Sequence, residues 1–155
     1  MIVDFEEFTK LKQHNKPILS LDVGKKRIGV ALSDKSWMLA SPSHVIINHK
    51  FTQSAEEILK FCDENDVCGI VIGLPLNFDG SNSKIAQSVK QFARNLAKLR
   101  DIPIYLQDER FTSIQAEEAL DEAGLNWSKR KDKVDKIAAS IILKDFIESC
   151  ERQNA

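Results

Sequence analysis

The chain has 155 residues, of which 43% are hydrophobic, and this length suits a single domain with a core of its own. Its formal net charge of −1 argues against a protein that binds polyanions through overall positive charge. The sequence contains no run of about 18 apolar residues, so no membrane span is predicted. Its polar, acidic start is unlike a secretory signal. We therefore expect a cytoplasmic protein without a membrane partner.

The cysteines and histidines do not predict a metal centre of the zinc type. The three cysteines form neither a C-x-x-C pair nor an even disulfide set, and the histidines lack the spacing of zinc ligands. We expect reduced cysteines that serve in packing: Cys62, Cys68 and Cys150.

The chain begins with a polar leader, residues 1–16, that carries a short helical pattern. Two runs rich in Ile, Leu and Val follow at Pro17–Val23 and Arg27–Ser33, separated by Gly24 and a basic pair. This arrangement predicts a β-hairpin, and a third strand is expected near Ser43–Asn48.

The middle of the chain alternates helical and strand patterns. Ser54 is expected to cap a helix, and a buried strand follows at Val67–Ile72. Apolar residues at helical spacing predict a helix near Ser83–Arg100, and another strand is expected at Ile104–Leu106.

The last third of the chain is expected to be helical. Thr112 opens a pattern that resembles a capping box, Gly124 is expected to end that helix, and residues 129–133 form a basic linker before the final helix. Three strands followed by alternating helices and strands predict an α/β protein with a mixed sheet covered by helices. We expect one domain at residues 17–150 and a tail at 151–155.

Three acids lie near the ends of hydrophobic segments: Asp22, Glu109 and Asp135. Carboxylates that converge among apolar neighbours are costly unless protons or bound divalent cations neutralise them. Oxygen donors suit hard ions such as Mg²⁺ or Mn²⁺, and two such ions can activate water in phosphodiester cleavage. The triplet therefore predicts a metal-dependent active site.

Each acid also has a simpler structural interpretation. Asp22 would be a turn residue before Gly24, although its flanking pattern favours a strand. Asp108 and Glu109 are neighbours that would point to opposite faces of a strand, and spacing alone does not choose between them.

Asp135 is expected to share the apolar stripe of the last helix with residues such as Ala138 and Ile142. Its alternative interpretation is an exposed acid in the first turn of that helix.

The loop from Gly73 to Ser81 joins a predicted strand to a predicted helix. Its backbone amides at the helix N-terminus are candidates for holding a phosphate. The alternative is a tight connection that needs glycine for its dihedral angles.

Four segments together resemble the bacterial YqgF family, also called RuvX: Asp22–Ala31, Gly73–Gly80, Asp108–Ser113 and Asp135–Ala139. The resemblance spans residues 17 to 148 and implies a ribonuclease H-like fold, with three antiparallel strands followed by two parallel ones. Proteins of this family bear names that describe a pre-16S rRNA nuclease or a Holliday junction resolvase.

The resemblance implies that the acid triplet supplies both the catalytic groups and the ligands for Mg²⁺ or Mn²⁺, with Glu109 preferred to Asp108. The basic residues Lys25, Lys26, Arg27 and Arg110 would position phosphates. Asn77, Thr112 and Ser113 complete the expected substrate-binding set, with a hydroxyl of the last two helping to order their loop.

Three functions follow from this resemblance. The first is an endonuclease that matures the 5′ end of 16S rRNA, acting on structured RNA, with a ribosomal precursor particle as partner. The second is a Holliday junction resolvase that cuts branched DNA as a symmetric homodimer, whereas the RNA nuclease would also work as a monomer. The third is a nucleic-acid-binding or ribosome-assembly factor without turnover.

Overall fold

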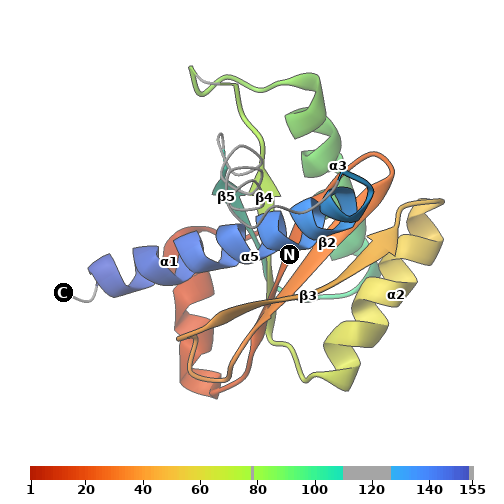
Figure 1. The fold of residues 1–155 in the computed structure, drawn as a ribbon. Helices are drawn as coiled ribbons and strands as arrows, with labels where there is room; N and C mark the ends of the chain where they lie inside the picture. The colour runs from red at the N-terminus through yellow and green to blue at the C-terminus, as the bar shows by residue number, and fades with distance from the viewer. Residues whose placement is uncertain (78, 110–126, 154–155) are drawn as a thin grey trace.

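The structure, a computed structural model, describes residues 1–77, 79–109 and 127–153, with the backbone alone for 127–133. A five-stranded sheet in the order β3-β2-β1-β4-β5 forms its centre (Figure 1). β1 pairs antiparallel with β2 and β2 with β3, whereas β1–β4 and β4–β5 are parallel. The predicted mixed sheet is therefore confirmed. Its strands are β1 Ile18–Val23, β2 Arg27–Ser33, β3 Ala40–Ile47, β4 Gly69–Leu74 and β5 Ile104–Asp108.

Helices cover both faces of the sheet. On one face α2 and α3 share a hydrophobic core with the strands, and on the other α5 crosses β2, β1 and β4 beside α1 (Figure 1). Among the described residues, none of the helices combines the length and apolar character needed to cross a membrane. The helices are α1 Phe5–Thr9, the 3₁₀ helix η1 Lys10–His14, α2 Phe51–Glu64, α3 Lys84–Leu99 and α5 Trp127–Gln153.

The alternation of side chains in β1 decides which face each residue meets. Leu19 and Leu21 belong to the core beneath α2 and α3, whereas Ile18 packs in the core beneath α5. Ser20 shares the α5 face, where its hydroxyl donates a 2.6 Å hydrogen bond to the carbonyl oxygen of Ala139. Because strand side chains alternate with a period of two, the next residue on the α5 face is Asp22.

Several predicted helix boundaries are confirmed and two are wrong. Ser83 caps α3 by accepting a 3.0 Å hydrogen bond from the amide of Ala86. Ser54 does not cap α2, because the helix begins at Phe51 and the buried Ser54 hydroxyl instead donates to the side-chain oxygen of Asn48.

The predicted basic linker is also wrong, because α5 begins at Trp127 and includes residues 129–133. This run contains no glycine or proline, and lysine and arginine are good helix formers, so the charges do not interrupt the helix. β3 begins at Ala40, three residues before the predicted start. The helix predicted from Thr112 to Gly124 lies outside the described residues.

The polar leader packs against the domain. Phe8 is fully buried, and its ring contacts Trp37, Tyr105 and Phe146. Residues before α1 pair in parallel with β5 through a bridge between Ile2 and Ile104, which covers this edge of the sheet. Edge strands are prone to unwanted pairing, and this bridge pairs one residue at the edge of β5.

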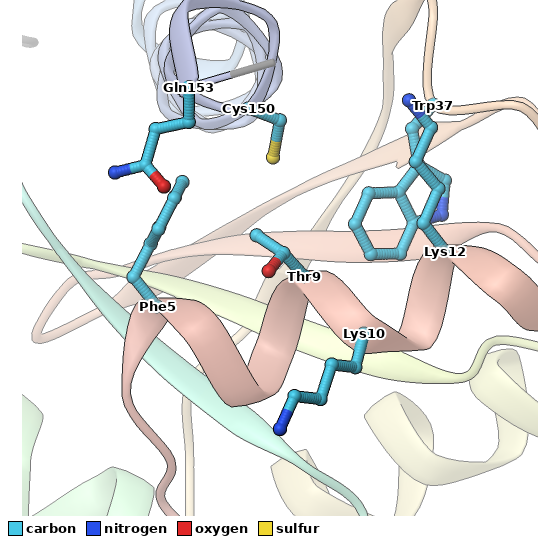
Figure 2. Close-up of a pocket in the computed structure, with 7 residues that line it drawn as sticks. All are labelled: Phe5, Thr9, Lys10, Lys12, Trp37, Cys150 and Gln153. Carbon is cyan, nitrogen blue, oxygen red and sulfur yellow. The ribbon is translucent and has the colours of Figure 1, made fainter.

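A small hollow of about 210 Å³ remains between the leader and the C-terminal end of α5. Figure 2 shows Phe5 and Thr9 facing Cys150 across it. Cys62 and Cys150 are buried and Cys68 is partly buried, and all three are free thiols, as the sequence predicts.

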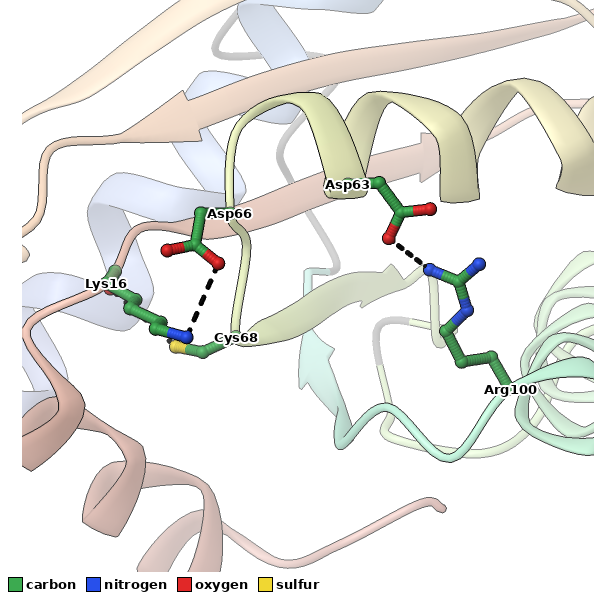
Figure 3. A network of polar contacts seen from close by, with 5 residues as sticks. All are labelled: Lys16, Asp63, Asp66, Cys68 and Arg100. Atoms are coloured by element: carbon green, nitrogen blue, oxygen red, sulfur yellow. Dashed lines mark hydrogen bonds and ion pairs between the residues drawn. The ribbon is translucent and has the colours of Figure 1, made fainter.

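Two ion pairs hold the end of the sheet where β1 and β4 begin (Figure 3). The Lys16 ammonium lies 3.3 Å from the Asp66 carboxylate, and Arg100 after α3 pairs with Asp63 of α2. The four side chains are largely exposed, so each pair contributes at most about 1 kcal/mol to stability. Both lie at the amino ends of the parallel strands, away from the predicted acid site at the carboxyl ends.

Candidate functional site

Asp22 lies between two glycines on the face of the sheet that α5 covers. It pairs with Gly29 of β2, and the register that pairs Leu21 with Ile72 places Gly73 of β4 on its other side. Neither neighbour carries a side chain, so groups from other elements fill the space around the partly buried Asp22 carboxylate.

Gly29 allows α5 to approach the sheet closely. A β-carbon at Gly29 would lie only 2.0 Å from the main-chain oxygen of Asp135, so the helix backbone rests directly on β2. This approach brings the carboxylates of Asp135 and Asp22 within electrostatic range. Burial, and then the charge of Asp135, raise the pKa of Asp22 from 3.8 to about 6.

The position of Asp135 in α5 excludes the first-turn interpretation. The helix begins at Trp127, so Asp135 lies more than two turns inside it, where its location is set by packing on the sheet. Its carboxylate lies 3.8 Å from the guanidinium of Arg27, the first residue of β2, and each side chain is more than a quarter exposed. Asp135 therefore sits between a repelling acid and an attracting base.

Glu109 approaches the same region from β5. Its amide donates a 3.0 Å hydrogen bond to the carbonyl oxygen of Leu74, and its γ-carbon would lie 3.7 Å from a β-carbon at Gly73. A β-carbon at Gly73 would meet the Ile142 side chain of α5 at 2.4 Å, so Gly73 makes room for α5, and the Glu109 side chain lies beside it on the same face.

The structure also separates the two neighbouring acids that spacing could not distinguish. In β5, Leu106 packs in the core beneath α2 and α3 and Tyr105 packs beneath α5. Continued alternation directs the exposed Asp108 to the α2–α3 face and Glu109 to the α5 face. Glu109 is thus the acid that shares a face with Asp22 and Asp135.

The other predicted site residues are placed less closely together. Lys25 and Lys26 are exposed in the turn between β1 and β2, beside Arg27. Asn77 is exposed, and its amide nitrogen donates to the hydroxyl of Ser81 within its own loop. Arg110, Thr112 and Ser113 lie outside the described residues.

The loop before α3 uses its own acceptors for three of its backbone amides. The amide of Asn77 bonds to the Ser81 carbonyl, that of Gly80 to the Asn77 carbonyl, and that of Ser81 to the Asp79 carboxylate. These amides are engaged and do not form an open phosphate cradle. Gly80 has φ of 87°, so the alternative prediction of a turn that needs glycine holds there.

Sequence reasoning missed the three residues that make room for the acids or hold α5 in place: Ser20, Gly29 and Gly73. A signal was present, because each is small and lies within an otherwise apolar strand pattern, where a packed residue is expected. Periodicity does not reveal which helix approaches such a position, so the pairing with α5 required the structure.

A metal site is not preformed in the described part of the chain. Within residues 1–77, 79–109 and 127–153, no group of three His, Cys, Asp or Glu side chains is close enough to hold an ion. The chemistry of the donor set nevertheless fits a hard divalent cation, because two carboxylates that repel one another and a third acid share one face.

Known proteins resemble this chain over most of its length. A protein of Chelativorans sp. named "Putative pre-16S rRNA nuclease" is 35% identical to this chain, over 99% of this chain and 96% of the relative. A protein of the same name in Phenylobacterium zucineum is 41% identical, over 95% of this chain and 96% of the relative. The relative of that name in Zymomonas mobilis is 44% identical over 85% of this chain and 80% of its own.

Among solved structures, Thermus thermophilus RuvC in complex with a Holliday junction substrate aligns with a TM-score of 0.51 at 14% identity. The alignment covers 87% of this chain and 96% of that one, which supports the ribonuclease H-like fold that the sequence predicts. The RuvX family, described as Holliday junction resolvase, matches residues 16–149. With that match and relatives of this identity, the chain belongs to the RuvX family.

Proposed function

We propose that this chain is a nuclease that hydrolyses phosphodiester bonds with the help of a divalent cation, and that it acts on structured RNA at the 5′ end of precursor 16S rRNA. The observation that carries the proposal is that Asp22, Glu109 and Asp135 lie on the same face of the sheet, beside Gly29 and Gly73. The names of its relatives support a nuclease acting on precursor 16S rRNA. Such a substrate would place the protein in the cytoplasm, in contact with a ribosomal precursor particle.

Asp22, Glu109 and Asp135 would hold Mg²⁺ or Mn²⁺. A bound cation of this kind supplies an activated water and neutralises charge on the phosphate. It would also relieve the repulsion between Asp22 and Asp135 that raises the pKa of Asp22.

The remaining residues of the site would position the substrate. Arg27 contacts Asp135 and lies beside the exposed Lys25 and Lys26, so three cations border the acids at one end of the sheet. Phosphates of a nucleic acid would dock on these cations, although the overall charge of the chain is slightly negative. Arg110, Thr112 and Ser113 remain predicted contacts.

A second candidate is a Holliday junction resolvase, which the description of the RuvX family favours. The same acids would cut branched DNA, and a symmetric dimer would be needed to cut two strands. The two substrates are distinguished by presenting precursor 16S rRNA and a four-way DNA junction to the same protein at one salt concentration.

The decisive experiment compares matched acid variants with added Mg²⁺ or Mn²⁺. We expect Asp22→Asn, Glu109→Gln and Asp135→Asn each to reduce cleavage more than about 100-fold, since loss of even an outer partner of a metal site costs 10- to 100-fold. Asp108→Asn is the control, because this neighbouring acid faces the opposite side of the sheet. Full cleavage by Asp22→Asn would refute the assignment, and tight binding without cleavage by the wild-type chain would favour the assembly-factor function.

A further inference from the structure

A groove of about 520 Å³ lies between the β1–β2 turn and α3, on the face of the sheet opposite α5. Val23 comes from the turn side, and the nearly buried Val89 and Phe92 come from α3, so the inner part of the groove is apolar. Figure 1 shows the hairpin that contains the turn beside α3. The volume lies within the range of about 300–1,000 Å³ that is typical of small-ligand pockets.

The outer part of the groove is basic. Lys25 of the turn and Lys84 of α3 both line it and both are exposed, and no acidic residue is among the described residues that line it. Ile85 also lines the groove, with 64% of its surface exposed. The groove therefore combines an apolar inner surface with two ammonium groups at its rim. This combination complements a nucleic-acid base, which has a flat apolar face, and its adjoining phosphates.

The groove is held in shape by the residue that follows β3. The side chain of Asn48 donates to the carbonyl oxygen of Gly24 at 2.8 Å, and its amide bonds to the carbonyl of Lys26 at 2.9 Å. These bonds hold the β1–β2 turn in place, so the groove exists before a ligand binds. Little ordering of the turn is therefore required on binding.

The groove is also next to the proposed active site. Val23 directly follows Asp22 in β1, and successive strand side chains point to opposite faces about 3.3 Å apart along the strand. Only the turn from Gly24 to Lys26 separates the acids on one face from the groove on the other. A nucleic-acid strand that crosses the tip of this turn would reach the groove within a few nucleotides of the bond at the acids.

We propose that this groove binds an unpaired base of the nucleic-acid substrate, with the adjoining phosphates on Lys25 and Lys84. The inference deepens the proposed nuclease function and rests on it. A base would stack against the apolar side chains of α3 whatever its identity, because every base has an apolar face. The site would therefore select single-stranded or distorted substrate near the cut, with little sequence preference.

The test fills the groove without touching the acids. Ser88 lines the groove and is exposed, so Ser88→Trp should occupy the space of the base, and Ile85→Asp should repel the phosphates. Gln87→Trp is the matched control, because Gln87 is an exposed neighbour on α3 that does not line the groove. Thermal melting of each variant establishes that it is folded.

Binding of a fluorescein-labelled single-stranded RNA of 12 nucleotides is measured by anisotropy in EDTA, so that cleavage does not intervene. We expect Ser88→Trp and Ile85→Asp to weaken binding about tenfold, in line with loss of one stacked base, and Gln87→Trp to leave it unchanged. An RNA of the same length in which every nucleotide is abasic should bind wild-type and Ser88→Trp proteins equally, because no base is then available to enter the groove.

If all variants bind RNA equally while the wild-type chain still cleaves its substrate with metal, the proposal that the groove binds a base is refuted. The proposed nuclease function is then unaffected. Groove-dependent binding without any cleavage would support the groove and refute turnover. A wild-type chain that neither binds nor cleaves nucleic acid would refute both. If RNA binding is unaffected and Ser88→Trp instead abolishes binding of a purified protein partner, the groove serves protein recognition and the proposal is wrong.

Discussion

Replacing Gly29 with alanine is expected to push α5 away from β2 and to disturb the acids without removing any of them. The new β-carbon would lie 2.0 Å from the carbonyl oxygen and 2.5 Å from the carbonyl carbon of Asp135. Non-bonded heavy atoms prefer separations of about 3.5 Å, so the helix must retreat by more than about 1 Å. Overpacking of this kind costs about 1–3 kcal/mol of folding free energy.

The retreat matters for activity because Asp135 belongs to the displaced segment. A displacement of about 1 Å in a catalytic group can cost about 100-fold in rate, so Gly29→Ala should lose far more activity than stability. The assay is metal-dependent cleavage of precursor 16S rRNA, together with urea unfolding of the same preparation. Far-ultraviolet circular dichroism checks that α5 is still helical.

Gly69→Ala supplies the control, since Gly69 lies at the opposite end of β4 from the acid site. A β-carbon there would meet the Phe8 ring at 2.7 Å, a side chain that can shift, so a loss of stability without loss of cleavage is expected. If Gly29→Ala cleaves as well as Gly69→Ala at equal stability, the close approach of α5 does not position Asp135 and the reasoning fails.

Two further predictions concern stability. Phe8→Ala should lower the free energy of unfolding in urea by about 3–5 kcal/mol, because the ring is fully buried. Arg100→Ala should lower it by less than about 1 kcal/mol, because the ion pair with Asp63 is exposed. Equal losses for the two variants would contradict this prediction. Burial, and then Asp135, raise the pKa of Asp22 to about 6, so the metal-free protein loses stability as pH rises from about 4 to about 6, by at most about 3 kcal/mol. Asp22→Asn should therefore melt at a higher temperature than wild type in EDTA at pH 8, and the difference should shrink towards pH 4; a lower melting temperature at pH 8 would contradict the raised pKa.

The local patterns predicted the strands and the central helices well. The hairpin of β1 and β2, the helix α3 and the buried strand β4 follow from period and length, which are local properties of the chain, although β4 begins and ends two residues later than predicted. The errors at Ser54 and at the basic run before Asp135 arose where a local signal competed with tertiary contacts. Ser54 bonds to Asn48 across a turn, and the basic run continues a helix that the sheet supports.

The sequence by itself determined that Asp22, one acid after the last strand and Asp135 border apolar segments, since hydrophobic periodicity marks such segments directly. Only the tertiary structure decided that Glu109, not Asp108, shares the face of Asp22. That choice depends on which alternate side chains of β5 point to the face of the sheet that α5 covers. It also revealed why the acids can approach one another at all. Gly29 and Gly73 leave the space around Asp22, and a helix far away in sequence fills it, so the site depends on contacts that no local pattern encodes.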